Sequence, residues 1–279
     1  MTGEMRTVSS NELSKLSITN IVGRQEISKI CVGKKGICTK EDIVKIHIKI
    51  PTYTLKTIMT LFEHTFYINL ESRRDRLAHV RNELAKMQIA GERIDAIKMA
   101  NGAIGCTMSH IHCLETAKSR NLPQVFICED DITFLNPSLL HENVGKFEKS
   151  GIAWDVIIIG GNNAPPYLPI SDYCIRVGNN QTTTGYIVKQ HYYDTLIQNF
   201  RESAAKFMSD PNNKRAYALD IYWKSLQHTG MWFMIIPATV VQYDDYSDIE
   251  GKYVRYLGAM LDVDKKKWPK PSMKIRFTK

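Results

Sequence analysis

The chain has 279 residues, of which 43% are hydrophobic and 24% are charged. These proportions are typical of a folded globular protein with one large domain or two small ones, and they exclude wholesale disorder and a collagen-like fibre. Lysine and arginine number 37 against 29 aspartates and glutamates, which gives a formal net charge of +8. A basic excess favours an anionic partner: a nucleic acid, an acidic membrane surface or a phosphorylated small molecule.

The sequence contains no segment that resembles a membrane span or a signal peptide. No stretch approaches the roughly 20 consecutive apolar residues that a spanning helix needs, and residues 1–16 lack the apolar core of a signal peptide. We therefore expect a cytoplasmic protein in a reducing compartment. The six cysteines form no C-x-x-C pair, so we expect buried free thiols. They are Cys31, Cys38, Cys106, Cys113, Cys128 and Cys174.

The chain divides into three zones. Residues 1–60 are lysine-rich and predict an accessory segment, with a short helix at Glu12–Leu16 and a strand at Ile46–Ile50. Residues 61–260 alternate strand-like and helix-like stretches. Residues 261–279 form a basic tail without apolar periodicity. We interpret the tail as solvated, and peripheral contact with an acidic membrane is the alternative.

The second zone opens with a short strand and an amphipathic helix. Thr65–Ile68 is the apolar run of the strand. Ser72 is the expected N-cap of the helix, with Asp75 in the capping-box position, and Gly91 is expected to end the helix. The apolar face of the helix repeats at spacings of three, four and three. It consists of Leu77, Val80, Leu84 and Met87.

The following elements predict an α/β fold. A second helix is expected from about residue 107 to 120, and the next strand at Val125–Cys128. Val156–Ile159 is an unbroken β-branched run, which is typical of a strand covered on both faces and is expected to stop at Gly160-Gly161. Later strands are expected near residues 186–188 and 234–241. Alternating strands and helices indicate a mainly parallel sheet flanked by helices.

The acidic triplet that follows Val125–Cys128 is the first candidate site. Side chains alternate along a strand, so we expect Glu129 and Asp131 to point one way and Asp130 the other. Ligands of parallel sheets bind beyond the carboxyl ends of the strands. Two converging carboxylates repel unless a cation lies between them, and hard oxygen ligands suit Mg²⁺ or Mn²⁺. The alternative is a solvent-exposed acidic turn.

The arginines at the start of the first helix are a second candidate. Arg73, Arg74 and Arg76 oppose the helix dipole, which a surface helix tolerates at little cost. A bound anion would reverse that penalty, because helix N–H groups and guanidinium forks bind phosphate. Arg73 and Arg76 are three residues apart and can act together.

The glycine-containing link at residues 101–110 matches neither G-x-G-x-x-G nor a P-loop. Cysteines and histidines follow each other closely here, but no zinc-binding spacing is present. Cys106, His110 and Cys113 share one helix face, and we interpret them as a packed face.

Two further acidic segments complete the candidates. Asp220 lies in an apolar, aromatic stretch, where burial would raise its pKa and make it a better base; a helix N-cap is the alternative. Residues 242–248 follow a predicted strand end and form either a polar active-site loop or an ordinary acidic loop.

Short motifs follow one another between about residues 64 and 250. They are Phe66-Tyr67-Ile68-Asn69-Leu70 with Arg73 and Arg76, Gly105-Cys106 with Ser109-His110, the strand ending in Glu129-Asp130-Asp131, Trp154-Asp155, Thr184-Gly185-Tyr186, Asp220, and Gln242 with Ser247-Asp248-Ile249. In this order they resemble glycosyltransferase family 25. That family contains bacterial lipooligosaccharide galactosyltransferases and animal collagen hydroxylysine galactosyltransferases, with relatives in large DNA viruses.

The resemblance implies a GT-A fold and an inverting transfer of galactose or glucose from UDP-galactose or UDP-glucose. It implies that Glu129 and Asp131 hold Mn²⁺ or Mg²⁺ against the diphosphate. It also implies that Asp220 is the general base, with Asp245 and Asp248 as alternative candidates for that role. It offers no third metal ligand. The residues implied in donor binding are Asn69, Leu70, Arg73, Arg76, Gly105, Ser109, Asp130, Thr184, Gln242, Ser247 and Asp248.

The acceptor stays open at this point. A lipooligosaccharide sugar, a collagen hydroxylysine and a galactosyl-hydroxylysine all offer a hydroxyl group. A nucleic-acid-binding protein, suggested by the net charge, and a non-catalytic sugar-binding member of the family are the competing hypotheses. We expect no nucleic-acid partner, because the acidic triplet lies in the middle of the chain. The sequence does not indicate an oligomeric state.

Overall fold

The structure is a computed structural model that describes residues 30–31, 43–44 and 60–266. The chain splits into two compact units, Met1–Thr54 and Leu55–Lys279. In the first unit, β1 (Ile30–Cys31) pairs antiparallel with β2 (Ile43–Val44). The helix expected at Glu12–Leu16 and the strand expected at Ile46–Ile50 lie outside the described residues. The zone boundaries expected at residues 60 and 260 stay predictions.

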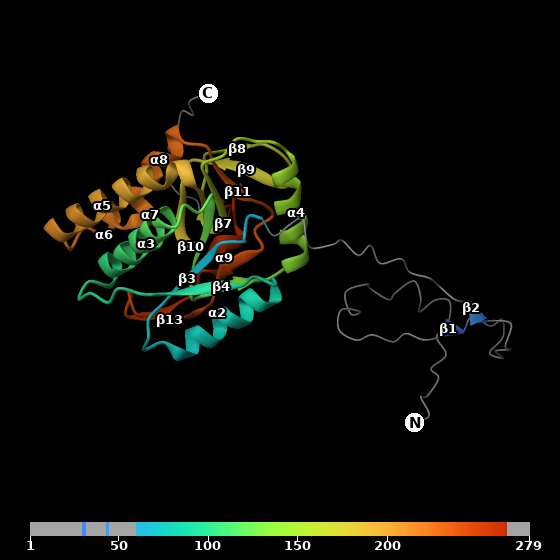
Figure 1. The fold of residues 1–279 in the computed structure, drawn as a ribbon, viewed down its shortest axis with the longest axis horizontal. Coiled ribbons are helices and arrows are strands. Elements are labelled where there is room, and N and C mark those ends of the chain that lie inside the picture. The colour runs from blue at the N-terminus through green and yellow to red at the C-terminus, as the bar shows by residue number, and fades with distance from the viewer. Residues whose placement is uncertain (1–29, 32–42, 45–59, 267–279) are drawn as a thin grey trace. The chain divides into compact units, whose positions relative to one another are not determined.

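The second unit is built around an eight-stranded sheet with the order β4-β3-β5-β10-β7-β11-β9-β8 (Figure 1). β3, β4 and β5 run parallel, as do β7 and β11, whereas β10 is antiparallel to both β5 and β7. Only β10 and β9 therefore run against the other strands. The strands are β3 (Thr65–Asn69), β4 (Gly91–Asp95), β5 (Gln124–Glu129), β7 (Val156–Asn163), β8 (Tyr167–Pro169), β9 (Cys174–Val177), β10 (Asn180–Lys189) and β11 (Trp232–Ile235).

Helices cover both faces of this sheet (Figure 1). Ile158 packs in the core on the side of α3 (Gly102–Ser119) and α5 (Tyr193–Ser209). Its neighbours Ile157 and Ile159 pack on the side of α2 (Arg74–Lys86) and α4 (Pro137–Lys149). Every residue of β7 is buried, as expected for its β-branched run. The α/β class with a mainly parallel, helix-flanked sheet is confirmed.

Smaller elements complete the unit. β6 (Ile132–Phe134) pairs with β12 (Val240–Gln242). β13 (Asp245–Ser247) and β14 (Lys252–Val254) form a two-stranded unit that we call the late hairpin. The remaining helices are η4 (Gln190–Tyr192), α6 (Lys214–Tyr217), α7 (Leu219–Tyr222), α8 (Lys224–Thr229) and α9 (Leu257–Leu261).

The first helix starts and ends differently from its prediction. Its N-cap is Arg73, and no side chain bonds the cap, so the predicted N-cap at Ser72 is wrong. The chain is held here by a tight turn, in which the Arg73 N–H donates to the Leu70 carbonyl at 2.9 Å. The predicted stop at Gly91 is also wrong, because the helix ends at Lys86 and Gly91 opens β4, a strand the pattern did not predict.

The second helix begins earlier than expected. The side chain of Asn101 caps it by accepting from the Ala103 and Ile104 N–H groups at 3.1 and 3.4 Å. Gly105 therefore lies inside the helix. A Cβ on Gly105 would come within 2.4 Å of the Ile97 carbonyl oxygen, so the absence of a side chain lets the helix approach the backbone after β4.

Two strand predictions needed correction. β7 runs through Gly160-Gly161 to Asn163, so these glycines do not end it. A Cβ on Gly161 would lie 2.4 Å from the Asn180 Oδ1, which shows that the glycine permits close packing against β10. The single strand expected at residues 234–241 is divided into β11 and β12, with Pro237 between them. Proline lacks the N–H group that a continuous ladder needs.

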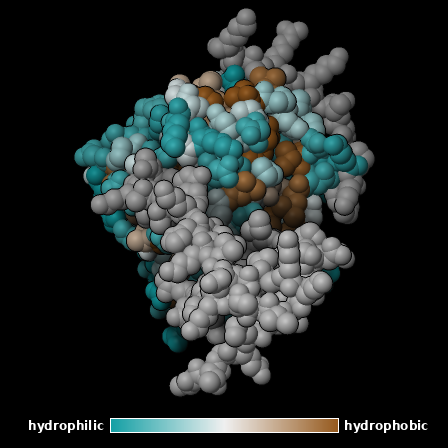
Figure 2. Space-filling model, turned by 90° about the vertical axis from the view of Figure 1, so that its right-hand side faces the viewer, coloured by the Kyte–Doolittle hydropathy of each residue, from teal (hydrophilic) through white to brown (hydrophobic). Residues whose placement is uncertain are grey.

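Most large apolar side chains of the described residues are buried. Cys113, Cys128 and Cys174 are buried free thiols as expected, whereas the free thiol of Cys106 is only partly buried. Figure 2 shows a face on which hydrophobic residues form a strip between hydrophilic ones. Some exposed apolar surface is normal for a folded protein. Within the described residues, no helix is long and apolar enough to cross a membrane.

Candidate functional site

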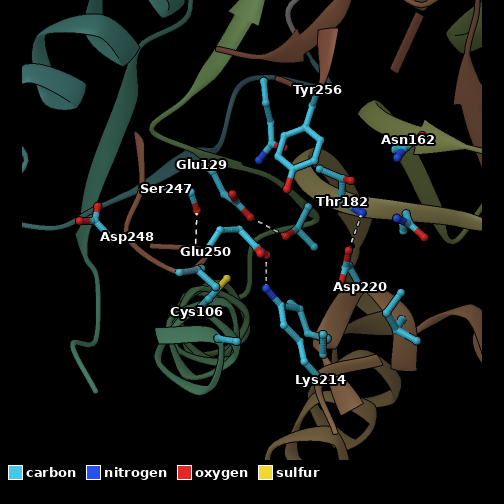
Figure 3. A pocket seen from close by; sticks show the side chains of 18 of the residues that line it. Cys106, Glu129, Asn162, Thr182, Lys214, Asp220, Ser247, Asp248, Glu250 and Tyr256 are labelled. Carbon is cyan, nitrogen blue, oxygen red and sulfur yellow. Dashed lines mark hydrogen bonds and ion pairs between the residues drawn. The ribbon is translucent and has the colours of Figure 1, made fainter. Parts of the chain in front are cut away.

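A cleft of about 620 Å³ opens at the carboxyl end of β5 (Figure 3). Glu129, Asp131 and Asp220 line it, and all three belong to the acidic candidates of the sequence. A second cavity of about 350 Å³ adjoins it and shares Leu70 and Cys106 among its lining residues. The location agrees with the rule that open α/β sheets bind ligands beyond the carboxyl ends of their strands.

The acidic turn, which we define as Glu129, Asp130 and Asp131, links β5 to β6. The Arg76 Nη1 lies 3.1 Å from the Asp130 Oδ1 and 3.2 Å from the Asp131 Oδ2. The prediction that Asp130 points away from Asp131 is therefore wrong. Strand alternation ends at Glu129, and the next two residues lie in a turn, where side chains two positions apart no longer define a face.

The reversed strand β10 brings its first residues to this same edge. Because β10 is antiparallel to β5, Thr183 reaches Glu129, and the Thr183 hydroxyl donates to the Glu129 Oε1 at 2.5 Å. Thr182 has a φ of 79°, which is a rare conformation for a β-branched residue. Its N–H group donates to the Asp220 Oδ2 at 3.0 Å. Such strain concentrates at functional sites.

The two carboxylates of the turn that face the cleft have opposite pKa shifts. Burial, and then the charge of Glu129, raise the pKa of Asp131 to about 8. Burial alone would also raise the pKa of Glu129, but its contacts with His110 and Thr183 lower it below the usual value. The Asp131 Oδ1 is buried and has no hydrogen-bond partner. An oxygen of this kind, next to a second carboxylate, fits a divalent cation.

The helix-start arginines act together, as expected, but their partners are carboxylates. The Arg73 Nη2 lies 2.6 Å from the Asp245 Oδ2, and its Nη1 lies 2.6 Å from the Asp248 Oδ2. The Arg76 Nε is 3.2 Å from the same Asp245 oxygen. These contacts and a backbone N–H outweigh the effect of burial and lower the pKa of Asp245. Arg73 therefore holds the late hairpin to the start of α2, and Arg76 links the hairpin to the acidic turn.

Asp220 lies in the first turn of α7 and faces the cleft (Figure 3). It is not the helix N-cap, which is Ala218. Burial raises its pKa, although the Thr182 N–H and the charge of Lys224 act in the opposite direction. Asp220 is thus only partly buried, but desolvation raises its pKa in the direction that the sequence predicted.

Lys214 on α6 and Glu250 after β13 form an ion pair at the rim of the cleft (Figure 3). Glu250 also donates its N–H to the Ser247 hydroxyl at 3.2 Å. Tyr256 lies on the other side of Glu129 in the same view. The late hairpin thus supplies one wall of the cleft, and α6 and α7 supply the opposite wall.

The other predicted donor-binding residues fall into two groups. Leu70, Arg76, Gln242, Ser247 and Asp248 line the larger cleft, and Ser109 and Asp130 line the smaller cavity. Neither of these two cavities is lined by the predicted donor-binding residues Asn69, Arg73, Gly105 and Thr184, or by Asp245, the reserve candidate for the base.

Some residues outside both cavities support the site. Asn69 is buried, and its Nδ2 donates to the Asp130 Oδ2 at 2.7 Å, so it orients the acidic turn. Thr184 is fully buried. Gln242, which lines the larger cleft, also contacts the turn, with its Nε2 3.4 Å from the Asp131 Oδ2.

Sequence reasoning missed several lining residues. Thr182 and Thr183 stand directly before the Thr184-Gly185-Tyr186 motif, and only the reversed direction of β10 brings them to Glu129. His110 was assigned to a packed helix face, yet its Nε2 lies 3.5 Å from the Glu129 Oε1. Lys214 has no sequence signal.

Comparisons with known proteins extend these observations. Residues 98–154 match the sequence model described as Glycosyltransferase family 25 (LPS biosynthesis protein). A Bos taurus protein named "Probable inactive glycosyltransferase 25 family member 3" is 27% identical over 135 residues, which cover 38% of this chain and 23% of that protein. A Haemophilus influenzae protein named "Putative glycosyltransferase" is 28% identical over 112 residues, which cover 31% of this chain and 40% of that protein. The chain therefore spans two fifths or less of these curated relatives.

Two solved structures are also similar. One is a glycosyltransferase involved in glycosylation of the major capsid of PBCV-1, with 9% identity and a TM-score of 0.39 over 71% of this chain and 88% of that chain. The other is a UDP-glucose pyrophosphorylase complexed with UDP-glucose, with 8% identity and a TM-score of 0.37 over 77% and 85%. Because both TM-scores are low, the fold assignment rests on the chain's own sheet.

The strand order and the cleft define an α/β protein of the class that binds its ligand beyond the carboxyl ends of the strands. Within that class, the matched segment contains the glycine-containing link, the acidic turn and Trp154, which carry three of the motifs identified in the sequence. The resemblance to glycosyltransferase family 25 is confirmed, and the family match covers residues 98–154.

Proposed function

We propose that this protein is a metal-dependent, inverting glycosyltransferase that moves galactose or glucose from a UDP-sugar to an acceptor hydroxyl. The observation that carries the proposal is the pairing of Glu129 and Asp131 at one cleft, with a buried Asp131 oxygen that lacks a partner. The family match supports the transfer reaction, and the Haemophilus influenzae relative is named for it.

Glu129 and Asp131 would hold Mn²⁺ or Mg²⁺, because carboxylate oxygens are the ligands that these ions prefer. The ion, when bound, would neutralise the charge that develops on the departing diphosphate. The chain's own contribution is to present both carboxylates on the same side. Thr183 fixes Glu129 through its hydroxyl, and Arg76 and Gln242 fix Asp131.

The donor would lie across the two adjoining cavities. Leu70 lines both of them, and Ser109 lines the smaller one at the carboxyl ends of β3 and β4. Arg76 also lines the larger cleft, where its guanidinium contacts Asp130, Asp131 and Asp245. A nucleotide in the smaller cavity and its sugar in the larger one would place the diphosphate beside the acidic turn.

Asp220 would take the proton from the attacking acceptor hydroxyl. Its partly buried position raises its pKa by desolvation, which favours proton uptake, and the Thr182 N–H holds one carboxylate oxygen in place. Asp245 is a weaker candidate, since two guanidinium groups contact it and its pKa is lowered. Asp248 also pairs with Arg73. We therefore propose Asp220 as the general base, with Asp245 and Asp248 as the alternative candidates.

The acceptor would enter between the late hairpin and α6, where Lys214 and Glu250 meet. We propose a glycan, such as a lipooligosaccharide sugar, or a collagen-like hydroxylysine or galactosyl-hydroxylysine. The description of the matching family as an LPS biosynthesis protein supports the first class. The bovine relative's family name does not separate the two.

A screen for UDP release tests the proposal. The full chain is incubated with a panel of UDP-sugars and Mn²⁺, first alone and then with oligosaccharide or collagen-like acceptors. We expect release with UDP-galactose or UDP-glucose and none from the Asp131→Ala variant. Asp172→Ala is the matched control, because Asp172 is exposed and does not line the cleft. A folded Asp131→Ala protein that retains full turnover would refute the metal assignment.

A second candidate function is a non-catalytic sugar-binding protein, because the bovine relative is named inactive. Calorimetry with UDP-sugars and Mn²⁺ distinguishes the two. Binding without release of UDP under every acceptor condition would favour the non-catalytic function, whereas turnover would exclude it.

A further inference from the structure

A second group of metal-ligating side chains lies behind the acidic turn. One ligand atom from each of Cys106, His110 and Glu129 lies within 4.8 Å of the others. Cys106 and His110 are four residues apart on α3 and so share one helix face. Glu129 comes from the end of β5, a different element. The fold therefore brings a thiol, an imidazole and a carboxylate together from two elements.

His110 provides an independent sign of a ligand at this place. Its side chain is fully buried, and its Nε2 has no hydrogen-bond partner. The Nε2 lies 3.5 Å from the Glu129 Oε1, so it is directed toward the other two ligands. The Nδ1 and the Tyr186 hydroxyl are 2.8 Å apart. A hydrogen bond on the far nitrogen is the arrangement that orients a metal-binding histidine.

The types of ligand indicate which ion fits. Sulfur, nitrogen and one carboxylate oxygen suit Zn²⁺ or Co²⁺, whereas Mg²⁺ and Mn²⁺ prefer oxygen. Bond lengths of about 2.0–2.3 Å in a tetrahedral site would hold ligand atoms roughly 3.5 Å apart. The observed limit of 4.8 Å therefore requires only small side-chain shifts. Cys106 also lines both cavities, which gives an ion a path from solvent.

We propose that Cys106, His110 and Glu129 form a binding site for Zn²⁺ that is separate from the Glu129–Asp131 pair but shares Glu129 with it. Binding replaces the thiol proton of Cys106, which leaves to solvent, and involves no oxidation or reduction. Since one carboxylate cannot serve both ions fully, Zn²⁺ inhibits the enzyme. This last consequence rests on the proposed function, whereas the site itself does not.

Cobalt titration of the full chain tests the site directly. Co²⁺ replaces Zn²⁺ and gives a near-ultraviolet thiolate-to-metal absorption band when sulfur is a ligand. We expect this band in the wild-type protein and in Cys113→Ser, and its loss in Cys106→Ser. Cys113 is the matched control, because it is a buried thiol on the same helix outside the cluster. A band that persists in Cys106→Ser, or that is absent from the wild type, would overturn the proposal.

The Asp131→Ala variant separates this site from the proposed catalytic ion. It should keep the cobalt band, because Asp131 is not a member of the cluster. If UDP release is found, Cys106→Ser should raise the Zn²⁺ concentration for half-inhibition by at least about tenfold, since metal sites lose affinity steeply with their ligands. An unchanged inhibition curve would overturn the competition. If no turnover is found, the proposed function fails and the cobalt experiment still decides the site.

Discussion

Replacing Asp131 by asparagine should make the metal-free protein less sensitive to pH. In the wild type, burial and the charge of Glu129 raise the pKa of Asp131 from 3.8 to about 8. The folded protein therefore holds a proton here that the unfolded chain releases above about pH 4. Because the folded state binds more protons, this residue's contribution to stability is complete at low pH and is lost as the pH rises toward 8. Asparagine does not titrate.

The size of the effect follows from the shift. Each pKa unit corresponds to about 1.4 kcal/mol. From pH 5 to pH 7, a span of two units inside the interval, the wild type should lose about 3 kcal/mol relative to Asp131→Asn. The contribution of Glu129 is lost only as the pH falls below its usual value of 4.5, and so lies outside this interval. The substitution also removes contacts with Arg76 and Gln242, which adds an offset independent of pH.

Urea unfolding in EDTA, followed by the fluorescence of the four tryptophans, measures both proteins at pH 5, 6 and 7. Asp172→Asn serves as the control, because its side chain is 81% exposed. Free energies of unfolding that change in parallel for wild type and Asp131→Asn would refute the electrostatic reasoning. Addition of Mn²⁺ provides a second comparison. It should stabilise the wild type by about 2.7 kcal/mol at a hundredfold excess over its dissociation constant, and Asp131→Asn much less.

Three other substitutions test separate parts of the structure. Asp220→Asn should lower transfer by about 10²–10⁴-fold while calorimetry shows unchanged donor binding; retained transfer would move the base to the aspartates of the late hairpin. Gly105→Ala should destabilise the protein by about 1–3 kcal/mol in urea unfolding, because its Cβ would lie 2.4 Å from the Ile97 carbonyl oxygen. Lys214→Ala should raise a substrate KM in the UDP-release assay, since Lys214 pairs with Glu250 across the cleft, and should change stability by less than about 0.5 kcal/mol because the pair is partly exposed.

The predictable parts of the fold are those in which local pattern and burial agree. The run Val156–Ile159 predicted a doubly covered strand, and every residue of β7 is buried. Val80 and Leu84 of helix α2 and its C-cap residue Met87 are buried in the core, as the spacing predicted. The start of α2 was predicted wrongly because the preceding turn depends in part on a long-range contact, in which the Asn69 side chain donates to Asp130 as well as to the nearby Arg73 carbonyl.

The direction of β10 could not be predicted from sequence, since its apolar residues read the same whichever way the strand runs. Because β10 runs antiparallel to β5, the first residues of β10 rather than its last residues lie at the cleft. This direction brings Thr182 and Thr183 to Glu129 and Asp220, and so completes a site whose acidic members the sequence had identified. The partners of Arg73 could not be predicted from sequence either, because Asp245 and Asp248 lie more than 170 positions away in the chain.

Arg76 joins the acidic turn at the floor of the cleft to the late hairpin, which forms one of its walls. Its guanidinium lies beside Asp130 and Asp131 on the floor, and it also holds Asp245 and the Tyr246 carbonyl of the hairpin. A cation that binds beside Asp130 and Asp131 weakens the ion pairs between these carboxylates and Arg76. It therefore also changes the contacts of Arg76 with the late hairpin. By thermodynamic reciprocity, whatever displaces the hairpin alters the affinity of the floor for cations to the same degree. A cation at the acidic turn and a ligand at the late hairpin can thus affect each other's binding without direct contact.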